Sequence, residues 1–121
     1  MKYKNILITG GAGFVGSNLA ISLKRDYPEI KIVALDNLKR RGSELNLTRL
    51  KDGGICFLHG DIRSREDLEG SDLFDLIIEC SAEPSALAGI DGTTDYLVHT
   101  NLLGTYHCLE LARKNNAGDR K

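Results

Sequence analysis

The chain has 121 residues, 41% of them hydrophobic and 27% charged, a composition typical of one water-soluble domain with a single core. Its 16 basic and 17 acidic residues give a net charge of −1, which argues against a nucleic-acid-binding surface. No apolar run approaches the length of a membrane span, and a strand pattern begins almost at once after Met1. We therefore expect a cytoplasmic protein with no signal peptide and no membrane partner.

Apolar strand patterns alternate with helical patterns along the chain. In order, they are a strand at residues 4–9, a helix at 14–26, a strand at 31–35, a helical piece at 45–50, a strand at 55–58, a helix at 64–69, a strand at 74–80 and a helix at 94–114. This alternation predicts an α/β fold with a doubly wound parallel sheet, right-handed crossovers and the strand order 3-2-1-4. In such a sheet the ligand crevice lies at the carboxyl ends of strands 1 and 4.

Two helices carry apolar side chains at helical spacing, which predicts their buried faces. In the first helix these are Val15, Leu19 and Leu23. In the last helix they are Leu97, Val98, Leu102, Leu109 and Ala112. The apolar run at residues 76–78 suits a strand that is buried on both faces.

Three cysteines, Cys56, Cys80 and Cys108, lie far apart and lack the spacing of metal ligands. Two fall in strand patterns and one in a helical pattern, so we expect buried free thiols in a reducing compartment. We predict no metal site.

The turn between the first strand and the first helix is rich in glycine. Its spacing fits Gly11-x-Gly13-x-x-Gly16 and also Gly10-x-x-Gly13-x-x-Gly16. Gly10 allows the sharp turn, Gly13 lets the backbone approach a pyrophosphate, and Gly16 lets the helix pack closely on the strand. With the helix N-terminus, this loop predicts a dinucleotide site, the alternative being a glycine-rich turn that binds nothing.

An acidic residue, Asp36, ends the second strand twenty residues after Gly16. Its carboxylate can accept hydrogen bonds from both hydroxyls of an adenine ribose and repels a 2′-phosphate, which favours NAD over NADP. The only basic cluster, Lys39-Arg40-Arg41, follows Asp36 without replacing it. We interpret the cluster as a solvated loop, with contact to a 2′-phosphate as the alternative.

Four stretches that together span nearly all of the chain resemble the extended short-chain dehydrogenase/reductase family, the NAD-dependent epimerases and dehydratases of nucleotide sugars. They are ITGGAGFVGSNLA at 8–20, LDNL at 35–38, HGDIR at 59–63 and NLLGT at 101–105. Within the family, LDNLKRRGSELNLTRL at 35–50 looks most like the CDP-paratose (CDP-tyvelose) 2-epimerases. The resemblance implies that residues 1–121 are the N-terminal part of a Rossmann-type dinucleotide-binding domain, without its fifth strand and without a substrate domain.

The resemblance also implies twelve cofactor-binding residues: Gly10, Gly13, Phe14, Val15, Gly16, Asp36, Asn37, Asp61, Ile62, Ser81, Ala82 and Asn101. The first four would hold the pyrophosphate, with Gly16 allowing the helix to pack beside it, the next two the adenosine ribose, and Asp61 with Ile62 the adenine. The pair after strand 4 would line the cofactor, and Asn101 would lie near the nicotinamide-side ribose. The alternative for Asp61 is a loop carboxylate without a ligand, and the alternative for Asn101 is a buried amide bonded to backbone.

The sequence departs from the family at two places. Many members carry a histidine where this chain has Glu79, whose side chain would lie either at the sheet surface or near the crevice. The family's catalytic Ser/Thr and Tyr-x-x-x-Lys residues follow a fifth strand, which this sequence does not contain. The spacing Tyr27-x-x-x-Lys31 is no substitute, because Pro28 breaks any helix between the two residues. We predict no catalytic residue in this chain and no turnover by it alone.

Two functions follow as hypotheses. In the first, the chain is the NAD-binding part of a nucleotide-sugar epimerase or dehydratase that acts by transient hydride transfer to NAD. In the second, it is a non-catalytic dinucleotide-binding sensor or regulatory module. In either case strand 4 would be a sheet edge with unpaired backbone groups, which favours a homodimer or self-association through that edge.

Overall fold

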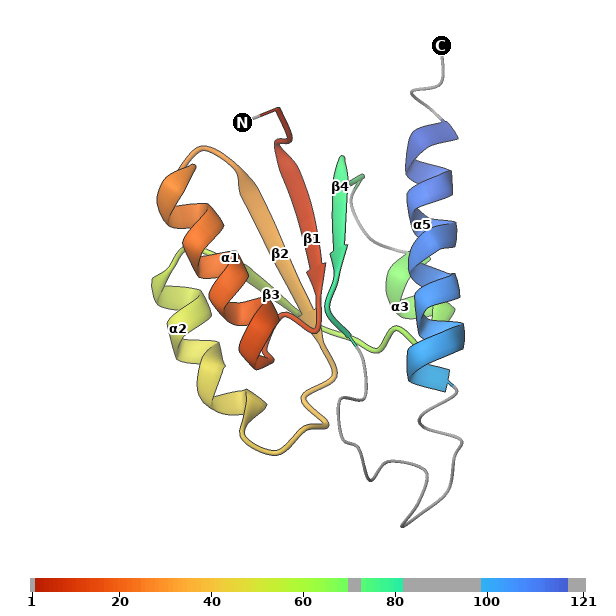
Figure 1. The fold of residues 1–121 in the computed structure, drawn as a ribbon, viewed down its shortest axis with the longest axis horizontal. Coiled ribbons are helices and arrows are strands. Elements are labelled where there is room, and N and C mark those ends of the chain that lie inside the picture. The colour runs from red at the N-terminus through yellow and green to blue at the C-terminus, as the bar shows by residue number, and fades with distance from the viewer. Residues whose placement is uncertain (1, 70–72, 82–98, 118–121) are drawn as a thin grey trace.

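The computed structural model describes residues 2–69, 73–81 and 99–117. This part of the chain forms a four-stranded parallel sheet in the order β3-β2-β1-β4, with helices on both faces (Figure 1). The predicted Rossmann-type fold and strand order are confirmed. The helix positions predicted at Leu97 and Val98 lie outside the described residues.

The elements alternate in the predicted order, with ends that differ from the predicted ones by a few residues. They are β1 (Asn5–Thr9), α1 (Phe14–Asp26), β2 (Lys31–Asp36), the 3-10 turn η1 (Ser43–Asn46), α2 (Leu47–Asp52), β3 (Cys56–His59), α3 (Arg65–Glu69), β4 (Leu76–Glu79), the π-helical turn η2 (His99–Gly104) and α5 (Thr105–Ala117). In-register parallel pairing joins β1 to both β2 and β4, so the carboxyl ends of these strands meet at one edge.

Successive residues of β1 face opposite sides of the sheet, and each side has its own core. On the side covered by α1 and α2, Ile6 and Ile8 are fully buried. On the side covered by α3 and α5, Leu7 is fully buried and packs in one cluster with Leu35 and Leu68 (Figure 1). The two cores fix the sheet between two helix layers and leave its carboxyl edge open.

Small residues form the buried ridge of α1, and the predicted stripe is wrong at its first position. Gly16 and Ala20 are buried, which lets the helix lie close to β1. Leu19 and Leu23 pack against the core as expected, but Val15 is 63% exposed. Val15 stands at the open carboxyl edge, where the helix has no neighbouring element to cover it.

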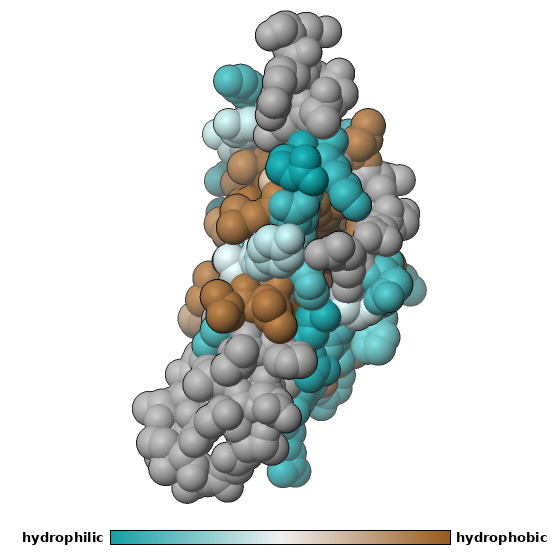
Figure 2. Space-filling view, turned by 90° about the vertical axis from the view of Figure 1, so that its right-hand side faces the viewer, coloured by the Kyte–Doolittle hydropathy of each residue, from teal (hydrophilic) through white to brown (hydrophobic). Residues whose placement is uncertain are grey.

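The predicted stripe of the last helix is wrong in the described part. Leu102 and Leu109 are each 64% exposed, whereas Cys108 and Leu111 pack in the core. The buried face runs instead through Gly104, Cys108 and Leu111, which are four and three residues apart, so the helix turns a different face toward the sheet. Figure 2, in which this side faces the viewer, shows apolar side chains exposed among hydrophilic ones.

The strand β4 and one of the cysteines are more exposed than predicted. Within the described residues β4 pairs only with β1, so residues 76–78 are half-buried and not covered on both faces. Self-association through this edge remains a prediction. Of the free cysteines, Cys108 is buried and Cys80 half-buried as expected for apolar positions, but Cys56, on the outer strand β3, is exposed. Among the described residues no group of side chains could hold a metal ion, and no helix could cross a membrane.

Candidate dinucleotide-binding site

The glycine loop after β1 has a backbone that side chains would prevent. Gly10 lies at φ +65°, and a Cβ there would sit 2.5 Å from the carbonyl oxygen of Cys80. A Cβ at Gly16 would overlap the carbonyl oxygen of Gly10. The loop is closed by hydrogen bonds from Gly13 N to Gly10 O and from Gly11 N to Leu35 O, each 3.0 Å. The glycines therefore allow a close approach of backbone segments that any side chain at Gly10 or Gly16 would prevent, and the loop lines the cavity described below.

The helix α1 begins at this loop. Gly13 is its N-cap, and neither a side-chain cap nor an acidic residue occupies its first turn. The first N–H groups of a helix have no partner within the helix, and they carry a partial positive charge. This end of α1 therefore fits a phosphate group.

Asp36 connects the glycine loop to the segment after β2. One carboxylate oxygen accepts a hydrogen bond from Ala12 N at 2.9 Å, and the other accepts one from Leu38 N at 2.8 Å. Asn46 holds the same loop through a 2.7 Å bond from its side-chain amide to Ala12 O. Each Asp36 oxygen keeps a second lone pair, so the carboxylate can still accept from two ribose hydroxyls.

Asp61, after β3, is held by two neighbours. Its Oδ2 accepts from the Asn37 amide at 3.0 Å and from the Arg63 guanidinium at 2.6 Å, and its Oδ1 accepts from Arg63 N at 2.9 Å. Partial burial raises the pKa of Asp61, but the hydrogen bonds from Arg63 and Asn37 and the charge of Arg63 outweigh it and lower the pKa from 3.8 to about 2. Oδ1 retains acceptor capacity for an adenine amino group.

The lowered pKa makes the contribution of Asp61 to stability dependent on pH. A carboxylate with a folded-state pKa of about 2 and an unfolded pKa of 3.8 stabilises the fold above pH 3.8, and this contribution is lost as the pH falls toward 2. We expect Asp61→Asn to lower the free energy of unfolding at neutral pH by less than about 1 kcal/mol, since the group is partly solvated. The difference from wild type should shrink between these two pKa values.

Urea unfolding of both proteins across this pH range measures the difference. Asp26→Asn is the control, because Asp26 pairs with Arg25 on the exposed surface and its loss should cost nothing measurable. A difference between wild type and Asp61→Asn that stays constant down to pH 2 would contradict the assignment.

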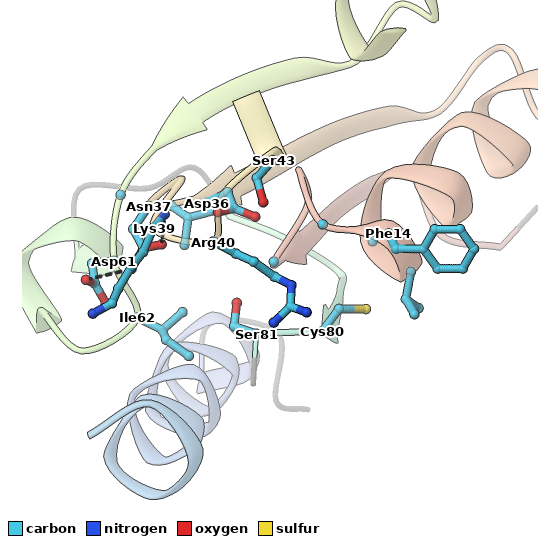
Figure 3. Close-up of a pocket in the computed structure, with 16 residues that line it drawn as sticks. Phe14, Asp36, Asn37, Lys39, Arg40, Ser43, Asp61, Ile62, Cys80 and Ser81 are labelled. Atoms are coloured by element: carbon cyan, nitrogen blue, oxygen red, sulfur yellow. Dashed lines mark hydrogen bonds between the residues drawn. The ribbon is translucent and has the colours of Figure 1, made fainter. Parts of the chain in front are cut away.

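The carboxyl ends of all four strands and the start of α1 enclose a cavity of about 490 Å³. Ten of the twelve predicted residues line it: Gly10, Gly13, Phe14, Val15, Gly16, Asp36, Asn37, Asp61, Ile62 and Ser81 (Figure 3). Ala82 lies outside the described residues. Asn101 is exposed on η2 and does not line the cavity, so the alternative of a buried amide is wrong and a role in cofactor binding remains a prediction.

Six further residues line the cavity, and the sequence did not place them there. They are Leu35, Lys39, Arg40, Ser43, Gly60 and Cys80. The basic cluster is exposed, as expected for a solvated loop, and Lys39 and Arg40 also line the cavity. The signal in the sequence was that this basic cluster lies close to Asp36, which raised contact with a 2′-phosphate as an alternative.

Glu79 is exposed at the carboxyl end of β4 and is not among the residues that line the cavity. One carboxylate oxygen accepts from Ser81 N at 2.7 Å and from the Thr9 hydroxyl at 3.4 Å, and the other accepts from the Thr105 hydroxyl at 3.0 Å. Through these hydrogen bonds Glu79, at the end of β4, links this strand to β1 and α5. Burial, aided by the charge of Glu79, raises the pKa of the Cys108 thiol to about 12, so this thiol stays protonated and is no nucleophile.

Tyr27 and Lys31 form no catalytic pair. The helix α1 ends at Asp26, Tyr27 is its C-cap, and Lys31 begins β2. Both lie at the amino end of β2, whereas the cavity lies at the carboxyl ends of the strands.

Residues 6–120 match the profile of the family described as "NAD dependent epimerase/dehydratase family". The chain belongs to this family. The prediction of NAD as the cofactor is confirmed by this membership, and the glycine loop, the carboxylate of Asp36 and the cavity fit such a dinucleotide.

Individual members of the NAD dependent epimerase/dehydratase family show the same likeness. The chain is 34% identical over 113 residues to a dTDP-glucose 4,6-dehydratase of Mycobacterium tuberculosis, covering 91% of this chain and 33% of that protein. It is 36% identical over 118 residues to a CDP-paratose 2-epimerase of Salmonella typhi, covering 93% of this chain and 33% of that protein. The chain thus spans about a third of the length of these relatives.

The fold also matches that of a solved structure. The crystal structure of a dTDP-glucose 4,6-dehydratase of Bacillus anthracis in complex with NAD superposes with a TM-score of 0.75 at 32% identity, covering 92% of this chain and 34% of that one. The fold of this chain is therefore shared with that NAD-bound structure.

Proposed function

We propose that this chain is the NAD-binding part of a nucleotide-sugar epimerase or dehydratase. The observation that carries the proposal is the cavity at the strand ends, in which the glycine loop, Asp36 and Asp61 lie together. NAD would supply transient oxidation, taking a hydride from a sugar carbon and returning it later. The glycine loop and the start of α1 would hold the pyrophosphate, and Asp36 the ribose.

Within this proposal, the substrate class is a nucleoside diphosphate sugar, and a CDP-sugar 2-epimerase is the finer candidate. Supporting it are the segment 35–50 and the 36% identity to the CDP-paratose 2-epimerase. The 34% identity to the dTDP-glucose 4,6-dehydratase supports the coarser class equally well, so the assay must include both. A cytoplasmic location and the lack of turnover by residues 1–121 alone belong to the proposal.

The test is to express the full coding sequence that contains residues 1–121 and to assay it with CDP-, UDP- and dTDP-sugars. NAD⁺ binding together with conversion of one of these substrates supports the proposal. NAD⁺ binding without conversion of any of them would favour the sensor hypothesis. Absence of NAD⁺ binding would remove both.

A further inference from the structure

The segment after β2 is bent back over the cavity. Leu38 lies at φ 59° and is the one non-glycine residue with positive φ in the described part of the chain. Hydrogen bonds hold this conformation, from Leu38 N to Asp36 at 2.8 Å and from Lys39 N to the Asn37 side chain at 2.9 Å. Strained backbone of this kind persists where its surroundings fix it, and it is common at ligand sites.

Arg40 follows this bend and crosses the cavity. Its carbonyl accepts a hydrogen bond from Ser43 N at 3.1 Å, which closes the loop. Figure 3 shows its side chain running from the Asp36 side toward Ser81 and Cys80, so the guanidinium lies at the β4 side of the cavity. Lys39, by contrast, extends toward Asp61 (Figure 3). The side chains of Lys39 and Arg40 therefore extend toward different ends of the cavity.

The charge of the cavity lining explains what Arg40 could contact. Asp36 and Asp61 supply negative charge at the end assigned to ribose and adenine, and Lys39 and Arg40 are the cations among the lining residues. The pyrophosphate of a dinucleotide carries two negative charges, and the backbone N–H groups of the glycine loop supply only partial positive charge. A guanidinium suits phosphate oxygens, because it donates two parallel charge-assisted hydrogen bonds.

We infer that Arg40 reaches across the cavity to bind the pyrophosphate of NAD from the side opposite the glycine loop. The inference rests on the proposed NAD site and adds to it a side chain that sets affinity. The 2′-phosphate of NADP is the competing ligand for a basic residue in this loop. Because the side chain of Arg40 extends away from Asp36, which is assigned to the ribose, and toward Ser81 (Figure 3), the geometry favours the pyrophosphate.

The experiment compares Arg40→Gln with Arg41→Gln in the full-length protein. Arg41 is the matched control, since it is the next residue of the same loop, is exposed and does not line the cavity. Calorimetry measures NAD⁺, NADP⁺ and ADP, and an NMR titration measures adenosine, which has no phosphate. We expect Arg40→Gln to weaken NAD⁺ and ADP by about tenfold to a hundredfold and to leave adenosine unchanged. Arg41→Gln should match wild type with all four ligands.

Equal NAD⁺ affinity of wild type and Arg40→Gln would overturn the inference, as would an equal loss of adenosine. A larger loss for NADP⁺ than for NAD⁺ would assign Arg40 to the 2′-phosphate and would also overturn it. If wild type itself binds no NAD⁺, the proposed function fails. If wild type binds NAD⁺ but converts no sugar, the affinities of Arg40→Gln and Arg41→Gln still test the inference about Arg40.

Discussion

Gly16→Ala is expected to abolish NAD⁺ binding and to destabilise the fold, whereas Gly13→Ala is expected to lose the cofactor and keep the fold. A methyl group at Gly16 would overlap the carbonyl oxygen of Gly10, which is backbone and cannot rotate away. The loop and α1 would have to separate, at a cost of about 1–3 kcal/mol. The site for the pyrophosphate would be distorted with them.

At Gly13 the same methyl group meets only the Gly10 carbonyl oxygen, at 3.2 Å, and the backbone has φ −77°, which any residue can adopt. The loss of stability should stay below about 1 kcal/mol. NAD⁺ affinity should nevertheless fall by about a hundredfold, because Gly13 lines the cavity where the backbone must approach the pyrophosphate.

Thermal denaturation and calorimetric titration of the two variants separate these effects. Gly54→Ala is a control for glycine replacement outside the cavity, since Gly54 has φ +80° but lies in the turn before β3. It should lose stability and keep NAD⁺ affinity. Normal NAD⁺ binding by Gly13→Ala would show that the phosphate does not lie on this loop.

The fold was predictable because its signals are local and repeated. The apolar strand runs, the glycine turn and Pro28 each constrain a short segment, and a parallel sheet with right-handed crossovers satisfies all of them. The exposed positions of Leu102 and Leu109 were not predictable in this way. They depend on which face of the helix turns toward the sheet, and Cys108 and Leu111 occupy that face.

The candidate cofactor site was likewise predictable only where its signals are local. The glycine loop and Asp36 follow from their own chemistry and spacing. The direction of the Arg40 side chain could not be predicted, because it depends on the positive φ of Leu38, a conformation that leucine rarely adopts. The hydrogen bonds that hold this bend are local, from Leu38 N to Asp36 and from Lys39 N to Asn37. The position of Glu79 likewise depends on Thr105, which is 26 residues away in sequence and contacts it only in the fold.

Asp36→Asn should reduce both NAD⁺ affinity and the preference for NAD⁺ over NADP⁺. In wild type both carboxylate oxygens accept backbone N–H groups, from Ala12 and Leu38. An amide can present only one acceptor oxygen, so its NH₂ group would face one of these donors, and a buried N–H without a partner costs about 1–3 kcal/mol. The glycine loop and the bend at Leu38 would loosen together.

The loss of charge acts separately on selectivity. Without the carboxylate, a 2′-phosphate is no longer repelled, while the free hydroxyls of NAD⁺ lose their strongest acceptor. We expect NAD⁺ affinity to fall by about tenfold to a hundredfold and NADP⁺ affinity to fall less, so that the preference narrows. Calorimetric titration of both cofactors measures this.

Asp75→Asn provides the control that separates stability from selectivity. Asp75 also accepts two backbone N–H groups, from Lys4 at 2.8 Å and Asn5 at 3.0 Å, but at the amino end of β1, away from the cavity. Its replacement should cost stability through the same loss of an acceptor and leave both cofactor affinities unchanged. If Asp36→Asn lost stability but kept the full preference for NAD⁺, Asp36 would be a loop anchor only, and discrimination against the 2′-phosphate would have to come from elsewhere in the lining of the cavity.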